Sequence, residues 1–290
     1  MLSFSSDLKS GEIDEVMELA VSCALAEDAP TLVQRVQSLV SSGQSSSRIV
    51  RFRLELQLVA IGLVNLGGSA TPGCVIAVDP SFRRRGFGTR MLQVVTSEVA
   101  QREIRIWNHG DCRSGLDFAQ RHGMTLLQQL NLMKVVNSPN KHLSHLKPRT
   151  DCTIRVVDPS ALSDDWHQLV NESYNSSSVS IELATRPWWP TSKIVVAETE
   201  SGNCVGLLVL RVVNYRGASA IENHLMAVHP SVRGLGIGSA LTSALVVFAN
   251  NNLFKYTISY VDRSNVAALE AHKNSGFFTV GSDSVFRYAW

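Results

Sequence analysis

An apolar run that leads into a glycine-rich loop and then into an amphipathic helix is the most informative pattern in this chain. Leu225–Val228 reads as a strand, a turn follows at Pro230, and the loop Arg233-Gly-Leu-Gly-Ile-Gly238 precedes a helix from about Ser239. Backbone N–H groups at a helix N-terminus have no intrahelical partner, and the helix dipole is positive there. The pattern therefore predicts an anion site, and a plain glycine turn before a surface helix is the alternative.

The same pattern occurs a second time, 150 residues earlier in the chain. Val78-Asp-Pro-Ser-Phe-Arg83 matches Val228-His-Pro-Ser-Val-Arg233, and Arg83-x-x-Gly86-x-Gly88 repeats the spacing of the later loop. This spacing differs from the dinucleotide fingerprint and from the Walker loop. A repeat at about half the chain length predicts two similar domains that both hold a phosphate-bearing ligand.

The remaining apolar and polar positions predict a matching order of elements in both halves. Helical spacing predicts helices at 11–26, 29–41, from the first glycine loop to about 102, and at 114–122, 160–174, 239–251 and 265–274. Alternating or continuous apolar runs predict strands at 48–54, 57–66, 74–79, 104–108, 125–136, 152–157, 193–198, 205–213, 220–228, 256–260 and 277–289. The order predicts a mixed α/β fold in each half, with a central, mostly antiparallel sheet flanked by helices.

A polar, basic segment with two prolines separates the halves. Residues 137–151 read Asn-Ser-Pro-Asn-Lys-His-Leu-Ser-His-Leu-Lys-Pro-Arg-Thr-Asp. Proline and polar residues are typical of linkers between domains. We therefore expect an N-terminal domain at 1–138, a linker at 139–151 and a C-terminal domain at 152–290.

Composition narrows the class of protein and of ligand. The chain has 290 residues, 44% of them apolar, with a net charge of +2, which gives no general case for nucleic-acid or membrane binding. Its five cysteines are scattered and show no metal-ligand spacing, and the N-terminus has no signal-peptide pattern. Apolar runs such as Leu58–Val64 are too short to span a bilayer. We expect a cytoplasmic, monomeric protein that binds small molecules and no metal.

The order of elements and the two loops resemble the GNAT family of N-acetyltransferases, which bind acetyl-CoA. The resemblance covers almost the whole chain, as two tandem domains. In that family the strand before the loop offers backbone groups to the pantetheine arm, and the loop holds the pyrophosphate. The resemblance implies acetyl-CoA contacts at Ile76, Ala77, Val78, Arg84, Arg85, Gly86, Phe87, Gly88 and Thr89, at Met226, Ala227, Val228, Arg233, Gly234, Leu235, Gly236, Ile237, Gly238 and Ser239, and at Asn265, Val266, Ala267, Ala268, Leu269 and Glu270.

Three stretches are similar to the two-domain GNAT enzymes of actinobacteria that make mycothiol. They are Trp107-Asn-His-Gly110, Tyr260–Ala268, and Glu222 placed four residues before Met226. The resemblance implies transfer of acetyl from acetyl-CoA to the cysteinyl amine of a cysteinyl-glucosaminyl-inositol. Other readings stay open: a tandem GNAT enzyme that acetylates another small amine or a protein N-terminus, and a CoA-binding regulator without catalysis.

Amine acylation needs a proton acceptor and a proton for the leaving thiolate. Glu222 is the candidate base, with a strand-end charge paired to Arg211 as the alternative. Many GNAT enzymes carry a tyrosine at the position of His272, so His272 is the candidate acid, or a helix-surface histidine without a chemical role. The resemblance places Arg211, Glu222 and Tyr260 at the acceptor, although Tyr260 is equally suited to packing.

Two departures from the family pattern limit this interpretation. The family has a His-Pro-Glu-Gln-like acceptor segment where this chain reads Asn175–Ser180. In place of that segment, Glu27 or Asp28 could supply a carboxylate to the acceptor, with helix capping as the alternative. The N-terminal half also lacks acid–base groups, since Ala119 stands at the position of His272 and Pro72–Ile76 offers no carboxylate. We therefore expect the N-terminal domain to bind acetyl-CoA or CoA and the C-terminal domain to catalyse.

Overall fold

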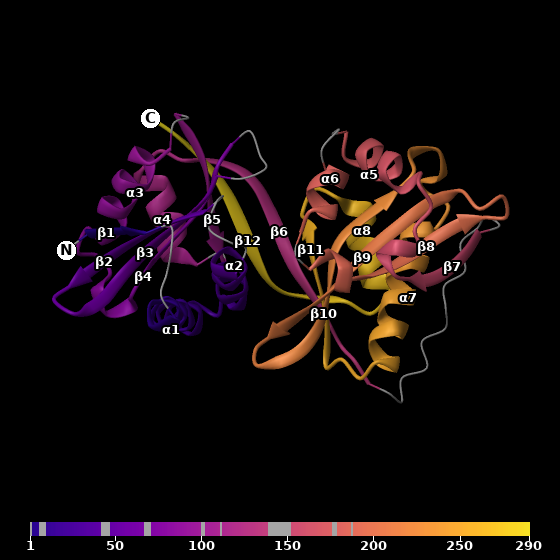
Figure 1. Ribbon diagram of the computed structural model, residues 1–290, viewed down its shortest axis with the longest axis horizontal. Coiled ribbons are helices and arrows are strands. Elements are labelled where there is room, and N and C mark those ends of the chain that lie inside the picture. The colour runs from indigo at the N-terminus through magenta and orange to yellow at the C-terminus, as the bar shows by residue number, and fades with distance from the viewer. Residues whose placement is uncertain are drawn as a thin grey trace. The chain divides into compact units, whose positions relative to one another are not determined.

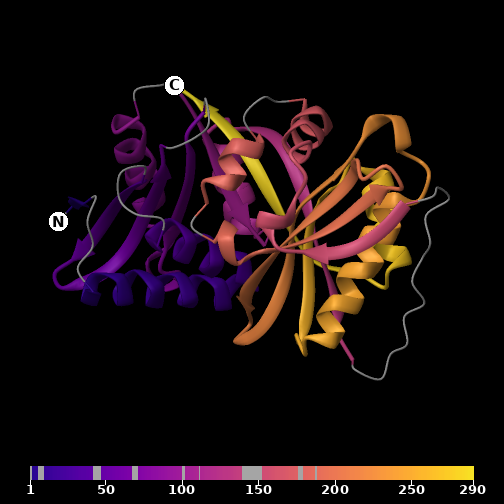
Figure 2. The same ribbon diagram turned by 45° about the vertical axis from the view of Figure 1, so that its right-hand side comes forward.

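The computed structural model describes residues 2–5, 10–41, 47–66, 71–99, 102–110, 112–138, 152–175, 179–186 and 188–290 (Figures 1 and 2). The chain forms two compact units. Unit 1 comprises Met1–Leu130 and Gly281–Trp290, and unit 2 comprises Asn131–Val280. The expected linker at 139–151 lies outside the described residues, and the expected domain bounds stay a prediction. Two long strands, β6 and β12, each contribute residues to both units.

Unit 1 is a sheet in the order β1-β2-β3-β4-β5-β12. Its strand pairs β1–β2, β2–β3, β3–β4 and β5–β12 are antiparallel, and β4–β5 is parallel. Its elements are β1 (Leu2–Ser5), α1 (Ser10–Glu27), α2 (Pro30–Ser41), β2 (Ser47–Leu54), β3 (Gln57–Asn65), β4 (Gly73–Val78), α3 (Phe87–Ser97), β5 (Glu103–His109), α4 (Arg113–Arg121), the first half of β6 (Thr125–Val136) and most of β12 (Phe278–Ala289).

Helices cover both faces of the unit 1 sheet. Val16 and Leu19 of α1 pack with Val36 of α2 on one face, and Met91 and Val95 of α3 pack on the other. In Figure 1, α1 and α2 lie below the sheet strands, whereas α3 and α4 lie above them. The two apolar layers hold β4 and β5 in the centre of the unit, as expected for a sheet with a hydrophobic surface on each side.

Unit 2 repeats this architecture with the order β6-β11-β10-β9-β8-β7. Here β10 and β11 are parallel, whereas β7–β8, β8–β9 and β9–β10 are antiparallel. Its elements are β7 (Cys152–Val157), α5 (Trp166–Tyr174), α6 (Val179–Ala184), β8 (Lys193–Thr199), β9 (Cys204–Tyr215), β10 (Ala218–Val228), α7 (Ile237–Asn251), β11 (Tyr256–Asp262), α8 (Val266–Asn274), and the remaining residues of β6 and β12.

A strand glycine lets the helix after each loop approach its sheet. A Cβ at Gly206 in β9 would lie 2.8 Å from Ile237 of α7, and a Cβ at Gly62 in β3 would lie 2.7 Å from Val95 of α3. Leu241 and Leu245 of α7 are fully buried against the sheet, each contributing roughly 2 kcal/mol of burial free energy. This close packing fixes the start of each helix against the central strands.

The expected mixed α/β fold with mostly antiparallel sheets is confirmed, with local differences. The helix after the first loop ends at Ser97 instead of about 102, and α5 begins at Trp166 after a 3₁₀ turn at Pro159–Ala161. The helix α6 lies where the sequence pattern gave a loop and an unassigned stretch. Across the described part of the chain, no helix has the length and apolar character needed to cross a membrane.

Candidate active site

The glycine loop of unit 2 ends in a helix start that can receive an anion. After β10 a 3₁₀ turn spans Pro230–Val232, and Gly234 and Gly236 follow with φ of +79° and +85°. These left-handed angles explain the glycines. Gly236 is the N-cap residue of α7, and within the described residues no side chain caps this helix. Its first N–H groups therefore remain available to a phosphate, which fits the expected cofactor.

The arginine that opens each loop acts as an internal brace. Arg233 Nε donates to the Val228 carbonyl at 3.2 Å, and Arg83 Nε donates to the Val78 carbonyl at 3.1 Å. Each bond ties the loop to the end of the strand before it. The shared arginine therefore fixes the shape of the loop, and the helix N–H groups are the candidate anion site.

One glycine of the unit 2 loop, Gly234, corresponds to an arginine, Arg84, in unit 1. Arg84 adopts φ of +63° at the position of Gly234, a conformation that costs a non-glycine residue about 1 kcal/mol. Its side chain is exposed, with Asp117 3.9 Å away, and Arg85 lies over the Phe82 ring. Two exposed cations beside an uncapped helix start suit a phosphate-rich ligand better than a bare turn.

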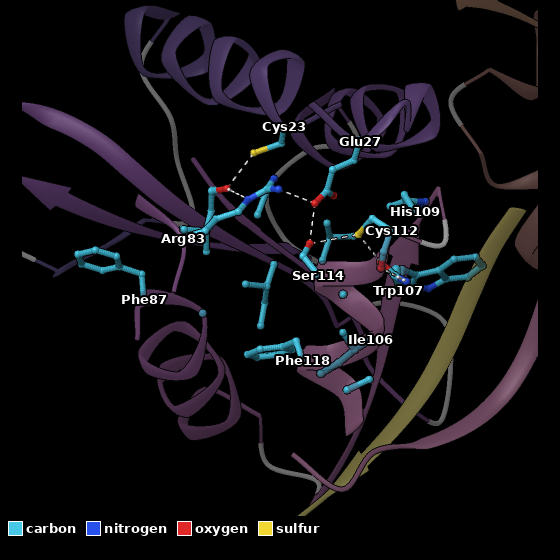
Figure 3. Close-up of a pocket in the computed structure, with 18 of the residues that line it drawn as sticks. Cys23, Glu27, Arg83, Phe87, Ile106, Trp107, His109, Cys112, Ser114 and Phe118 are labelled. Carbon is cyan, nitrogen blue, oxygen red and sulfur yellow. Dashed lines mark hydrogen bonds and ion pairs between the residues drawn. The ribbon is translucent and has the colours of Figure 1, made fainter. Parts of the chain in front are cut away.

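A cavity of about 340 Å³ lies in unit 1 where two parallel strands separate (Figure 3). β4 and β5 pair only at Gly73–Arg105 and Cys74–Ile106, and both strands then continue beyond the last pair. The strand ends Val75–Val78 and Ile106–His109 line the cavity together with the first loop and α4. The volume falls within the range of small-molecule sites.

A polar network closes the α1 side of this cavity, as Figure 3 shows. Glu27 Oε1 accepts hydrogen bonds from Arg83 and from Ser114 Oγ, and Cys112 Sγ donates to Asn108 Oδ1 at 2.9 Å. Burial raises the pKa of the Cys112 thiol to about 11. Of the two carboxylates proposed for the acceptor, Glu27 lines the cavity, whereas Asp28 is exposed.

The C-terminal strand supplies a buried carboxylate to unit 1. Asp283 Oδ2 lies 2.8 Å from His109 Nδ1, and Asp283 Oδ1 accepts from the Gly110 N–H at 2.9 Å. Both side chains are almost fully buried. This contact, which no sequence pattern indicated, fastens β12 to the end of β5 beside the cavity.

In unit 2 the corresponding strands also separate, beside a β-bulge. β10 and β11 pair over Ala220–Asn223 with Tyr256–Ser259, and β10 then runs on to Val228. The register between β10 and β9 shifts between Asn223 and Leu225, so His224 is the bulged residue. Bulges of this kind redirect side chains and often lie next to active sites.

Glu222 lies directly before this bulge, with both carboxylate oxygens engaged. It pairs across the sheet with Arg211, whose Nη2 is 2.8 Å from Oε2, and His224 Nδ1 is 3.1 Å from Oε1. Burial raises the pKa of this carboxyl, but the His224 hydrogen bond and the Arg211 charge outweigh it and hold the pKa below its usual range. Glu222 is therefore ionised at neutral pH.

An aromatic ring organises the two partners of Glu222. The Arg211 guanidinium lies 5.4 Å from the centre of the Trp188 ring, and the His224 ring meets Trp188 edge-on with centroids 4.6 Å apart. Arg211, predicted at the acceptor, thus belongs to a cluster with Glu222, His224 and Trp188. Sequence reasoning missed His224 and Trp188, although the two-residue spacing of Glu222 and His224 on one strand indicates a shared face.

His272 does not join this cluster. Its side chain is 1% exposed, its Nδ1 donates to the Ala268 carbonyl at 2.7 Å, and its Nε2 accepts from Asn223 Nδ2 at 3.2 Å. Burial lowers the pKa of this imidazole, which keeps it neutral. His272 is thus a buried, internally bonded residue and not a helix-surface one, and its role as the acid stays a prediction.

The residues of α8 and β11 that were expected to contact the cofactor or the acceptor also make contacts within the protein. Asn265 Oδ1 accepts the Ala268 N–H at 3.0 Å and so caps α8, whose first-turn residues Val266 and Ala267 are exposed. Tyr260 is half-buried and packs against a small cluster that contains Ile258. These positions leave the start of α8 accessible, as a cofactor contact there requires.

The backbone of Met226 and Val228 faces away from β9. His229 donates its N–H to Val205, so alternation along the strand turns the carbonyls of Val228 and Met226 to the other edge. Tyr174 Oη donates to the Met226 carbonyl at 3.1 Å. The N–H groups of the same two residues share that edge and are the predicted contacts for a thioester oxygen.

Comparisons with known proteins agree with this geometry. Residues 163–277 match the acetyltransferase (GNAT) family model. A mycothiol acetyltransferase of Thermobispora bispora is 27% identical over 290 residues, covering 96% of each chain. A mycothiol acetyltransferase of Saccharomonospora viridis is 27% identical over 225 residues, covering 72% of this chain and 71% of the relative.

Solved structures match the fold across both units. A GCN5-related N-acetyltransferase from Sphaerobacter thermophilus superposes with a TM-score of 0.75 at 15% identity, over 99% of this chain and 95% of that chain. A tandem GNAT protein from the clavulanic acid biosynthesis pathway gives a TM-score of 0.75 at 13% identity, over 100% and 98% of the two chains. The protein is thus an acyltransferase with two tandem GNAT folds, and residues 163–277 carry its GNAT-family domain.

Proposed function

We propose that this acyltransferase moves an acetyl group from acetyl-CoA to the cysteinyl amine of a cysteinyl-glucosaminyl-inositol, which gives mycothiol. The observation that carries the proposal is the cluster of Glu222, His224 and Arg211 beside the bulge of β10. It places His224 two residues, and Glu222 four residues, before the backbone N–H of Met226. The mycothiol acetyltransferase of Thermobispora bispora, matched over 96% of this chain, supports the choice of acceptor.

Acetyl-CoA, when bound, supplies the acetyl thioester. In unit 2 the uncapped start of α7 would hold its pyrophosphate, because Gly234 and Gly236 open the loop and Arg233 braces it. The N–H groups of Met226 and Val228 would orient the thioester carbonyl and stabilise the negative charge that develops on its oxygen. Arg211 and Trp188 would border the amine.

Unit 1 would bind acetyl-CoA or CoA without transferring the acetyl group. It keeps the loop, the helix start and a cavity of about 340 Å³ between β4 and β5. Pro72 and Cys74 stand at the positions of Glu222 and His224, so no carboxylate of unit 1 occupies the place of Glu222. The five free cysteines support a cytoplasmic location.

The test is release of CoA thiol by the purified protein with acetyl-CoA and the cysteinyl-glucosaminyl-inositol. We expect turnover with this amine and little with unrelated amines or a peptide N-terminus. Turnover with other amines but not with this one would show that the acceptor is a different amine. Tight acetyl-CoA binding without release for any amine would contradict catalysis.

A further inference from the structure

Glu222 is shielded from an incoming amine by its own partners. Arg211 occupies Oε2 and His224 occupies Oε1, and the Glu222 side chain is only 6% exposed. The His224 side chain, in contrast, is 31% exposed. An amine that approaches this cluster from solvent therefore meets the imidazole before it meets the carboxylate.

The hydrogen bond to Glu222 determines which ring nitrogen of His224 holds the proton. An ionised carboxylate can only accept, so His224 Nδ1 must donate across the 3.1 Å contact. In the neutral ring, Nε2 then carries the lone pair. A carboxylate that fixes Nδ1–H and leaves Nε2 basic is the arrangement that makes histidine a general base in Ser–His–Asp sites.

The His224 ring is also held in place by its neighbours, at the bulge of β10. Trp188 meets it at an interplanar angle of 75°, and Arg211 lies against the same indole. The bulge sets His224 where β10 leaves β11, two residues before Met226. Two residues of extended strand span about 7 Å. The His224 ring can therefore reach an amine that attacks a carbonyl bound at the Met226 N–H.

We propose that His224 is the catalytic base of the transfer and that Glu222 is its positioning residue, an inference that rests on the proposed function. A C–N bond forms between the amine nitrogen and the thioester carbonyl carbon, and His224 Nε2 takes the proton that the amine loses. The C–S bond breaks as the thiolate leaves. The thiolate takes up a proton from solvent and the imidazolium returns its proton to solvent, so atoms and charges balance without redox change.

Two substitutions separate base chemistry from packing. His224→Gln keeps an N–H that can reach Glu222 but has no basic nitrogen, and His224→Ala removes both. With acetyl-CoA and the cysteinyl-glucosaminyl-inositol, each should lower kcat by roughly 10²-fold or more. The control is His167→Gln, an exposed histidine on α5, which should keep native kcat. A near-native kcat for His224→Gln would overturn the proposal.

Rescue by added imidazole distinguishes a catalytic base from a residue that only packs. Added imidazole should restore part of kcat in His224→Ala, where it can occupy the space beside Trp188 and Glu222. It should not restore His224→Gln, because the glutamine fills that space. Loss of kcat in His224→Ala with no rescue would assign His224 a structural role and overturn the proposal.

Ring-nitrogen NMR tests the tautomer without any acceptor. In the free full-length protein near neutral pH, the neutral ring of His224 should carry its proton on Nδ1. A proton on Nε2 would overturn the proposal, whatever the substrate. A wild-type protein that shows the expected tautomer but does not acetylate the cysteinyl conjugate would instead count against the proposed function alone.

Discussion

Glu222 and His272 lie on opposite faces of strand β10. Glu222 faces Arg211 and His224, whereas the next residue, Asn223, turns to the other face and donates to His272 Nε2. This follows from the alternation of side chains along a strand. The structure therefore separates the two residues that the sequence pattern suggested as base and acid, and it brings His224 to Glu222 instead.

His272 should matter for stability and little for turnover. His272→Phe keeps most of the buried volume but removes the bond to Ala268 and one of the two acceptors of Asn223 Nδ2, the other being Ser259 Oγ. An unsatisfied buried amide costs about 1–3 kcal/mol, so the free energy of unfolding should fall by that amount. Urea denaturation measures this effect, and thiol release should keep kcat within about threefold. A well-folded variant with kcat reduced roughly 10²-fold would restore His272 as the acid.

Burial of His272 also predicts a pH dependence of stability. Its pKa is lowered in the folded state from the ordinary 6.5, so the unfolded chain takes up a proton first as the pH falls. The stabilisation is therefore complete above about pH 6.5 and is lost progressively as the pH falls below it, towards the folded-state pKa. Urea titrations between about pH 8 and pH 5 should show a steeper loss in the wild type than in His272→Phe. Parallel curves would contradict the neutral, buried state.

Cys112 should report occupancy of the unit 1 cavity. The thiol lines this cavity, and its pKa of about 11 predicts slow alkylation at neutral pH and faster alkylation as the pH rises. Acetyl-CoA or CoA should protect it, as measured by mass spectrometry of the alkylated protein. Gly86→Glu should abolish that protection. Equal labelling of Cys112 with and without CoA would argue against a ligand in unit 1.

The C-terminal strand should be required for the stability of unit 1. Asp283→Ala removes the acceptor of the Gly110 N–H and the partner of His109. Leaving these buried donors without their acceptor should cost roughly 2–4 kcal/mol of unfolding free energy. Asp164→Ala, at an exposed carboxylate of unit 2, is the matched control and should change stability by less than about 0.5 kcal/mol. Equal stabilities for the two variants would contradict a structural role for the contact.

Local patterns were sufficient to predict most of the fold. The apolar periodicity placed α1, α7 and the central strands, and the duplicated glycine loop predicted two similar units. The same patterns missed the return of β12 to unit 1, because the Asp283–His109 contact joins residues 174 positions apart. A one-dimensional pattern carries no information about such a pairing.

The candidate site was predicted less completely than the fold. The loop residues depend on local backbone conformation, which glycine spacing reveals. The partners of Glu222 depend on cross-strand register and on a bulge, which the sequence does not show. Arg211 was found through the family resemblance, whereas His224 and Trp188 emerged only when β9, β10 and the segment after α6 were brought together.

Gly86→Glu and Gly236→Glu test the central claim, that acetyl transfer takes place in unit 2, most directly. The two glycines have φ of +84° and +85°, so a side chain strains both loops alike and places a carboxylate at either anion site. The measurement is CoA thiol release with acetyl-CoA and the cysteinyl-glucosaminyl-inositol. We predict that Gly86→Glu keeps most of the wild-type kcat and that Gly236→Glu abolishes turnover. Loss of turnover in Gly86→Glu with retention in Gly236→Glu would contradict the account.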